Sequence, residues 1–414
     1  MKDFIEKIRL QDEKELLIYM DQAFNAPAIN KMLAFKNKQE KERDISDLMR
    51  GFNLPLSPQI GGRLHTISQE ILNLFEFTER PVTFYINNDP ECNAFAYFNP
   101  NEDEPHIISL NSGLVDKATE DELRFIIGHE FGHLIYAHAV FNRLISFIYP
   151  DRQPPFLNNI YRLWANLSEM SADRIGALAV TDFETALSAM FKITCGGLDM
   201  MRFQINASNF MAMTDGIITD MMASQQNFLG ETHPTNSVRI KALDVFYHSK
   251  LRQSFLEKRI YLEDDELTKK TDELILLLQQ RPADEAEYAK LDFLAAAGFY
   301  LIKSDEDIDA EEYDELINIL SAYHYWPPDY VDNLLKDTDP MEIIDKAAAY
   351  IVENTPQDVR PLFNQLIPLI MKDRRIDDKE IDALLIVAEK LKLPKAEAVD
   401  EILSVIRNLY FPLA

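Results

Sequence analysis

The sequence predicts a mostly helical α+β domain followed by an all-α domain. Helical periodicity dominates the chain, but three short segments with strand character lie between residues 82 and 110. One group of strands surrounded by helices favours a small sheet packed against a helix. In the last third of the chain, segment 302–312 recurs in outline at 370–380, which predicts two similar helical hairpins. The three expected strands are Val82–Ile86, Ala94–Phe98 and Ile107–Leu110.

Composition and turn signals divide the chain into four segments. Residues 1–45 read as charged helices, with Lys36–Arg43 as either a solvated face or a connector. The α+β domain is expected at 46–250, and a helical connector at 251–280. The all-α domain is then expected at 281–414, because Arg281 is followed by the helix-breaking Pro282.

A central helix is predicted around an H-E-x-x-H sequence formed by His129, Glu130 and His133. The T-x-x-E capping box at 119–122 marks its start, and an apolar run continues to Val140. Residues four apart lie on one face of a helix, so both histidines can direct an imidazole at one ion, with Glu130 beside them. The spacing therefore predicts half of a zinc site.

A catalytic zinc ion usually has three protein ligands, so one more ligand is expected. The best candidate is Glu169, on a helix expected at 161–180. Asp173 lies four residues later on the same face, where its carboxylate can accept the other ring N–H of a ligating histidine. The alternative for this pair is a solvated acidic helix face.

Two further histidines are candidates for a role at the site. On a continuous helix, His138 lies on the face opposite His129, which favours packing or hydrogen bonding over metal binding. His233 lies in a polar loop before a helix expected to begin near Asn236, and loops often carry functional side chains. The alternative for His233 is an ordinary exposed side chain.

These motifs resemble the zinc metallopeptidase family that includes HtpX and the CAAX prenyl proteases, a gluzincin group with H-E-x-x-H followed by E-x-x-x-D. The resemblance extends over roughly residues 46–243. Further matching segments are Asn93-Ala94-Phe95-Ala96, Ser109–Leu114, and Thr232–Pro234 with Arg239.

The resemblance implies one zinc ion per chain, bound by His129, His133 and Glu169, with Glu130 as the general base. It also implies that Asp173 and Arg239 support the ligands and that His233 faces the metal. Asn93, Ala94, Phe95 and Ala96 would form the edge strand that binds substrate. The fold implied is a gluzincin domain with its sheet against the H-E-x-x-H helix.

Charge, cysteine content and hydropathy restrict the partners and the compartment. The net charge of −27 opposes binding to nucleic acid. Two cysteines are too few for a disulfide framework, and the first residues lack the apolar core of a signal peptide. No integral membrane segment is expected, since no window reaches about eighteen uncharged apolar residues. These features predict a cytoplasmic protein, whereas many relatives are membrane-bound or exported.

The repeated C-terminal segment resembles TerB-like domains, which are all-helical modules with an acidic turn in each half. Asp305, Asp307 and Asp309 fit the first positions of an EF-hand loop, but Ala310 replaces the required glycine and Leu316 the required glutamate. We interpret the acidic residues as helix caps and as a charged surface for a protein partner, with weak divalent-cation binding as the alternative.

Two functions from different classes follow from the sequence. The first is a zinc endopeptidase that hydrolyses extended or misfolded polypeptides. The second is a zinc-stabilised scaffold that works through its acidic C-terminal domain. An intermediate interpretation has the C-terminal domain control access to the cleft, and it predicts faster cleavage by a chain that ends near Arg281.

Overall fold

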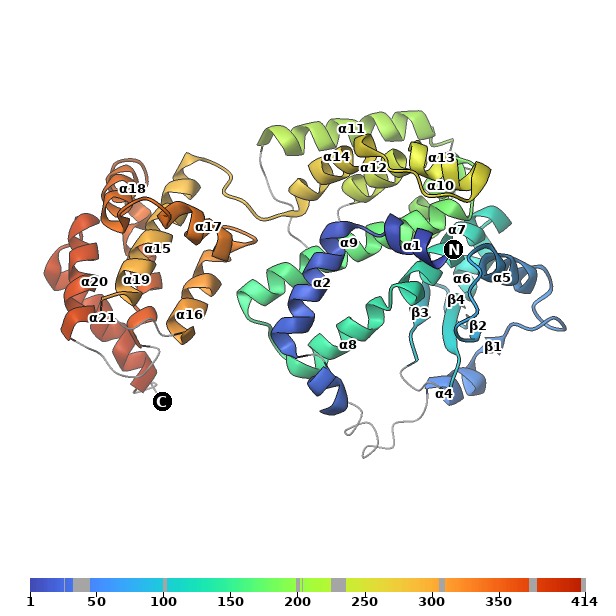
Figure 1. The fold of residues 1–414 in the computed structure, drawn as a ribbon, viewed down its shortest axis with the longest axis horizontal. Coiled ribbons are helices and arrows are strands. Elements are labelled where there is room, and N and C mark those ends of the chain that lie inside the picture. Colours follow the sequence, from blue (N-terminus) through green and yellow to red (C-terminus); the bar gives the residue numbers. More distant parts are fainter. Residues whose placement is uncertain are drawn as a thin grey trace. The chain divides into compact units, whose positions relative to one another are not determined.

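The computed structural model describes residues 1–25, 27–32, 45–99, 103–198, 202, 204–224, 236–304, 310–371 and 378–410. The chain forms two compact units, whose elements are labelled in Figure 1. Unit 1 comprises residues 1–152, 161–221 and 230–278, and unit 2 comprises 153–160, 222–229 and 279–414. The four segments expected from the sequence, with boundaries at 45, 250 and 280, remain a prediction.

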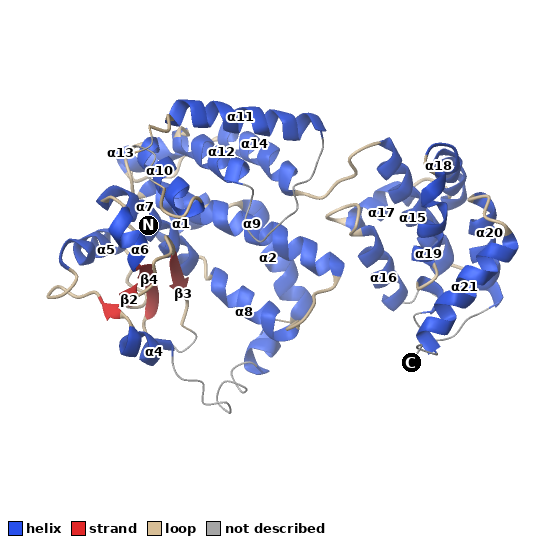
Figure 2. Cartoon of the chain, turned by 180° about the vertical axis from the view of Figure 1, so that it is seen from behind, coloured by secondary structure: helices blue, strands red, loops and turns tan. Residues whose placement is uncertain are grey.

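Unit 1 contains a four-stranded sheet in the order β1-β2-β4-β3, shown in red in Figure 2. The central strands β2 and β4 are parallel, and β3 is antiparallel to β4. The three predicted strands are therefore confirmed, whereas β1 was missed because two residues give no alternating pattern. The strands are β1 Leu54–Pro55, β2 Val82–Asn87, β3 Ala94–Tyr97 and β4 His106–Asn111.

Helices cover this sheet and build the core of unit 1. Helix α7 contacts β3 and β4, and its buried Phe125, Ile126 and Phe131 join Ile108 and Leu110 of β4 in one apolar cluster. The expected packing of the sheet against the motif helix is thus confirmed. The helices are α1 Lys2–Ile8, α2 Gln11–Phe24, α4 Ile45–Phe52, α5 Gly62–Leu74, α6 Ser112–Lys117, α7 Glu120–Ile135, α8 His138–Ile148, α9 Pro155–Leu178, α10 Phe183–Thr194, α11 Ala207–Ser224, α12 Asn236–Tyr247, α13 Lys250–Lys258, α14 Asp265–Ile275 and the 3₁₀ turn η1 Leu276–Leu278. Residues 155–160 of α9 and 222–224 of α11 belong to unit 2.

The motif helix starts where the sequence predicts and ends earlier than the apolar run suggests. The Thr119 side chain accepts from the Glu122 N–H, and the Glu122 carboxylate accepts from the Thr119 N–H, so the capping box is present. The helix stops at Ile135, and Ala137 adopts a left-handed φ of 54° before α8 begins. The placement of His138 on the far face of a continuous helix is therefore wrong.

Within its described residues, unit 2 consists only of helices around an apolar core. The central helix α15 packs against α16, α18 and α20, and its Phe293 and Leu294 are fully buried. The two acidic turns, including Asp305, Asp307 and Asp309, lie outside the described residues, and the TerB-like assignment remains a prediction. The helices are α15 Glu285–Ile302, α16 Ala310–Leu320, α17 Pro327–Leu335, α18 Pro340–Asn354, η2 Pro356–Asp358, α19 Val359–Leu366, η3 Leu369–Met371, α20 Asp378–Lys390 and α21 Lys395–Tyr410.

Candidate metal centre

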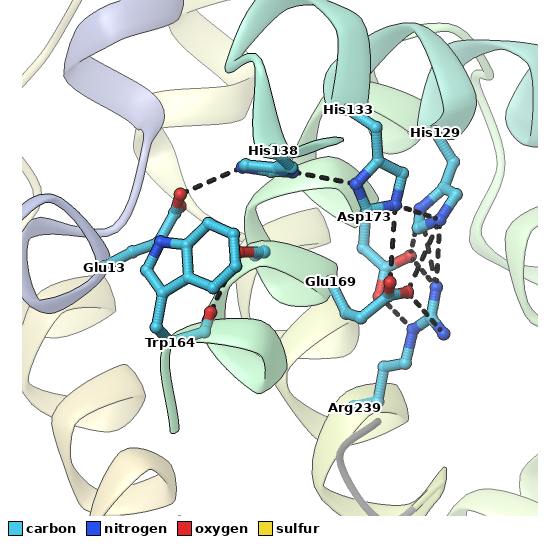
Figure 3. A network of polar contacts seen from close by, with 9 residues as sticks. Glu13, His129, His133, His138, Trp164, Glu169, Asp173 and Arg239 are labelled. Atoms are coloured by element: carbon cyan, nitrogen blue, oxygen red, sulfur yellow. Dashed lines mark hydrogen bonds and ion pairs between the residues drawn. The ribbon is translucent and has the colours of Figure 1, made fainter. Parts of the chain in front are cut away.

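Three helices of unit 1 bring the polar residues of the site together (Figure 3). Helix α7 provides His129, Glu130 and His133, and α9 provides Glu169 and Asp173. Arg239 comes from α12, which begins at Asn236 as the sequence predicts. Residues separated by up to 110 positions in the sequence therefore lie next to one another. The packing of α7, α9 and α12 brings them together.

Glycine and alanine allow α7 and α9 to approach closely beside the two histidines. A Cβ atom at Gly132 would lie 2.9 Å from the Cα of Ala172, and one at Gly128 would lie 3.1 Å from the Cα of Gly176. A larger side chain at either glycine would push the helices apart. This close packing holds Glu169 on α9 within reach of the histidines on α7.

The nearest atoms of His129, His133 and Glu169 form a triangle of the size that a zinc ion requires. The two Nε2 atoms lie 3.1 Å apart, the Nε2 of His129 lies 3.5 Å from Glu169 Oε2, and the Nε2 of His133 lies 3.4 Å from Glu169 Oε1. Tetrahedral bonds of about 2.0–2.1 Å place ligand atoms about 3.3 Å from one another. Two imidazole nitrogens and one carboxylate oxygen are also a common catalytic zinc donor set. The three residues therefore fit the ion that the sequence predicts.

Asp173 and Arg239 form polar contacts with the residues of this triangle. The Asp173 Oδ1 atom lies 2.9 Å from His129 Nδ1, so His129 can donate its Nδ1–H there and keep the Nε2 lone pair for a metal. Arg239 donates to both Asp173 oxygens, over 2.6 Å and 2.8 Å, and its Nη1 lies 3.0 Å from the Glu169 carboxylate. One guanidinium thus fixes two carboxylates in place.

The electrostatics of the cluster favour charged carboxylates despite their burial. Burial disfavours the Glu169 carboxylate, but Arg239 and the two imidazoles hold its pKa well below the usual range. Burial likewise opposes the charge on Asp173, and Arg239 and His129 hold its pKa below the usual value. Burial would lower the pKa of His133, whereas Glu169 and Glu130 keep that pKa above its usual value. A carboxylate ligand is therefore ionised and ready to bind a cation.

Glu130 and strand β3 complete the surroundings of the triangle. Glu130 follows a proposed ligand directly and is 8% exposed, so its carboxylate is shielded from bulk water. Strand β3 contacts α7 and pairs only with β4, which leaves its other edge unpaired within the described sheet. Ala94 of this strand is buried, whereas Phe95 is 37% exposed. Asn93 precedes the strand, and its side chain accepts from the Ala94 N–H over 2.9 Å.

Of two further residues next to the site, His138 was expected to pack or hydrogen-bond, whereas Glu13 was not predicted from the sequence. The His138 Nδ1 atom lies 2.8 Å from His133 Nδ1, and His138 Nε2 lies 2.9 Å from the carboxylate of Glu13. Glu13 had no detectable signal, because it lies 125 positions before its partner. His233 lies outside the described residues.

Comparisons with known proteins identify part of this region. Residues 58–150 match the sequence model of peptidase family M48, a stretch that includes β2 to β4 and all of α7 but ends before Glu169. The matched stretch covers less than a quarter of the chain. No solved structure matches the chain significantly.

Two curated proteins show similarity to this chain. Metalloprotease LoiP of Escherichia coli (strain K12) is 32% identical over 85 residues, which are 20% of this chain and 31% of LoiP. Plastoglobule-localized metallopeptidase 48, chloroplastic, of Arabidopsis thaliana is 26% identical over 151 residues, which are 34% of this chain and 42% of that protein. The chain thus spans less than half the length of either relative. Together with the family match, these similarities support a metallopeptidase.

Membrane-spanning helices require a long apolar stretch. Among the helices of the described ranges, none is long and apolar enough to cross a membrane.

Proposed function

We propose that this protein is a zinc-dependent endopeptidase. The observation that carries the proposal is the triangle of His129, His133 and Glu169, whose nearest ring-nitrogen and carboxylate-oxygen distances are 3.1–3.5 Å, next to a buried glutamate. The family match and the metalloprotease relatives support the same reaction class. One zinc ion per chain would be bound through the two Nε2 atoms and the Glu169 carboxylate.

The side chains around the triangle have distinct tasks in peptide hydrolysis. A bound zinc ion supplies the acidity that lowers the pKa of a water to about 7. Glu130 would take up a proton from the attacking water and would return it to the leaving amine. Asp173 keeps His129 in the tautomer with a free Nε2 lone pair. Arg239 holds Asp173 and Glu169 in place through the reaction.

We assign the unpaired edge of β3 to substrate binding. An extended peptide would add to this edge through main-chain hydrogen bonds, beside Asn93, Ala94, Phe95 and Ala96. Because β3 contacts α7, a peptide on this edge would lie close to the helix that carries Glu130. Hydrogen bonds to the peptide main chain depend little on the sequence of the substrate, so extended or misfolded polypeptides are the proposed substrates.

The first test is cleavage of an unfolded model protein by zinc-loaded full-length chain, with Glu130→Gln as the matched variant. An amide at this position cannot take up the proton, so we expect loss of cleavage by about 10²-fold or more with zinc still bound. Fragments would be followed by mass spectrometry, and zinc by elemental analysis. Cleavage at the wild-type rate by the variant would refute Glu130 as the base.

A zinc-containing but inactive wild type would favour the other interpretation, a scaffold that works through the acidic C-terminal helices. It would equally favour a latent enzyme whose C-terminal domain controls access. The chain truncated near Arg281 separates the two, because only the latent enzyme gains activity when that domain is removed.

We also propose a role for His233 in this reaction, on the basis of the family resemblance. It either donates to the oxyanion of the tetrahedral intermediate or acts as a fourth ligand in a resting state. His233→Ala should lower the cleavage rate in the first case and raise basal cleavage in the second. An unchanged rate would contradict both roles.

A further inference from the structure

A chain of hydrogen bonds leads from the metal site to the N-terminal helices (Figure 3). It runs from His133 on α7 through His138 at the start of α8 to Glu13 on α2. The Nδ1 atoms of the two histidines lie 2.8 Å apart, and His138 Nε2 lies 2.9 Å from Glu13 Oε1. His138 is 3% exposed and Glu13 is fully buried, so water does not compete for these contacts.

We propose that His138 and Glu13 are positioning residues that orient the ring of His133 for metal binding. The proposal rests on the zinc site proposed above, in which His133 binds through Nε2. A neutral ring with a free Nε2 lone pair carries its hydrogen on Nδ1. His138 must then accept that hydrogen bond at its own Nδ1, which places its hydrogen on Nε2. The Nε2–H finally donates to Glu13, so a single carboxylate determines the tautomers of both rings.

At the Glu13 end of this chain of hydrogen bonds, the carboxylate pairs with a cation and is not in contact with solvent. Arg9 donates to the same Oε1 atom from Nε over 2.9 Å and from Nη2 over 2.6 Å. The guanidinium also lies 4.9 Å from the centre of the Tyr136 ring, at the end of α7. A buried ion pair of this kind fixes the position of the carboxylate against which His138 is aligned.

Main-chain contacts attach the corner between α1 and α2 to the helices of the metal site. The Leu10 N–H donates to Ser171 Oγ over 3.1 Å, and Arg174 donates to the Ile8 carbonyl over 2.8 Å. Ser171 and Arg174 flank Asp173 on α9. The corner therefore couples the position of α9 to that of Glu13. The N-terminal helices, for which sequence patterns predict no role, complete the support of His133.

The test compares five full-length proteins: wild type, Glu13→Gln, His138→Phe, His138→Asn and Glu15→Gln. Glu15 is exposed on the same helix and matches the Glu13 substitution. Phenylalanine in place of His138 keeps the ring shape without an acceptor, whereas asparagine keeps an acceptor near the Nδ1 position. Glutamine in place of Glu13 keeps the size of the side chain but removes the negative charge, so the hydrogen bonds that Arg9 and His138 donate to Oε1 become weaker. Zinc affinity is measured by competition with a chromophoric chelator.

We expect His138→Phe and Glu13→Gln to bind zinc about 10- to 100-fold more weakly than wild type. His138→Asn should lose less affinity than His138→Phe, and Glu15→Gln should bind zinc as tightly as wild type. A general loss of stability would not reproduce the difference between the two His138 variants. A wild-type affinity in both His138→Phe and Glu13→Gln would overturn the proposal. If the His138→Phe protein is unfolded at room temperature, the zinc affinity of Glu13→Gln relative to Glu15→Gln tests the proposal instead.

A second readout does not need zinc and separates this proposal from the proposed function. In metal-free protein at about pH 9, the ring ¹⁵N shifts of His138 should report the Nε2–H tautomer in wild type and a weaker preference for that tautomer in Glu13→Gln. Wild type that binds no zinc would refute the zinc site, yet this tautomer change would still support the positioning chain. Identical tautomers in the two proteins would overturn it.

Discussion

At the scale of single residues, His106 links stability to pH. It begins β4 and is 4% exposed, and its Nδ1 accepts from the Asn99 N–H over 3.1 Å. Burial, with the nearby Arg80 charge, lowers its pKa from 6.5 to about 4. Between these pH values the unfolded chain binds a proton that the folded chain does not bind. The contribution of His106 to stability is therefore complete above pH 6.5 and is lost as the pH falls towards 4.

Urea unfolding of metal-free protein between pH 4 and pH 7 measures this effect. His106→Asn keeps an acceptor near the Nδ1 position but does not titrate, so its free energy of unfolding should depend less steeply on pH than that of wild type. The exposed His248→Asn serves as the control and should keep the wild-type slope. Equal slopes for wild type and His106→Asn would show that other groups cause the pH dependence.

The parts of the site that lie close together in sequence could be predicted at this scale. His129 and His133 are one helical turn apart, as are Glu169 and Asp173, so each pair was expected on one helix face, and the H-E-x-x-H motif made the acidic pair a ligand candidate. The role of Glu13 could not be predicted from the sequence, because an isolated acidic residue on a charged helix gives no sign that it will be buried. Only the fold brings it to His138.

At the scale of elements, the contact between α7 and α9 sets the geometry of the site. Gly132→Ala would place a methyl group 2.9 Å from the Cα of Ala172, and a backbone atom can move only with its helix. We expect a loss of about 1–3 kcal/mol in the free energy of unfolding. Zinc affinity should fall as well, because the histidines move away from Glu169.

Gly216→Ala on the exposed face of α11 is the matched control for this substitution. A Cβ atom there has no neighbour within 4 Å, so alanine should stabilise the protein by about 0.5–1 kcal/mol through its helix propensity. Both changes can be followed by urea unfolding and zinc titration. A Gly132→Ala protein as stable as wild type would show that α7 and α9 tolerate a wider separation.

The end of α7 illustrates what local patterns cannot reveal about elements. The apolar run continues to Val140, and no glycine or proline marks a stop. The helix nevertheless ends at Ile135, and Ala137 takes a left-handed conformation that costs alanine about 1 kcal/mol. This cost is offset by contacts far away in sequence, because the turn allows His138 to reach Glu13.

At the scale of the whole molecule, the net charge of −27 opposes the compact state through self-repulsion. Raising NaCl from about 10 mM to about 150 mM shortens the screening length from about 30 Å to about 8 Å. We therefore expect the melting temperature to rise across this range, as measured by circular dichroism. A fall in melting temperature would show that attractive ion pairs outweigh the repulsion.

The general architecture was largely predictable, because it depends on periodicity along the chain. Three of the four strands, the motif helix and the helical C-terminal region follow from local patterns. The strand order β1-β2-β4-β3 and the docking of α1 and α2 do not, since both depend on contacts between distant segments. The TerB-like resemblance concerns turns that lie outside the described residues and stays a prediction.

The guanidinium of Arg239 has a consequence for the order of events during biosynthesis. It pairs with both Asp173 and Glu169 within the folded protein and offsets one of their two negative charges, so the burial of these carboxylates depends less on a bound metal. A newly made chain would therefore complete its fold first and take up the proposed ion afterwards. Metal supply would then determine how much of the folded protein carries the proposed ion.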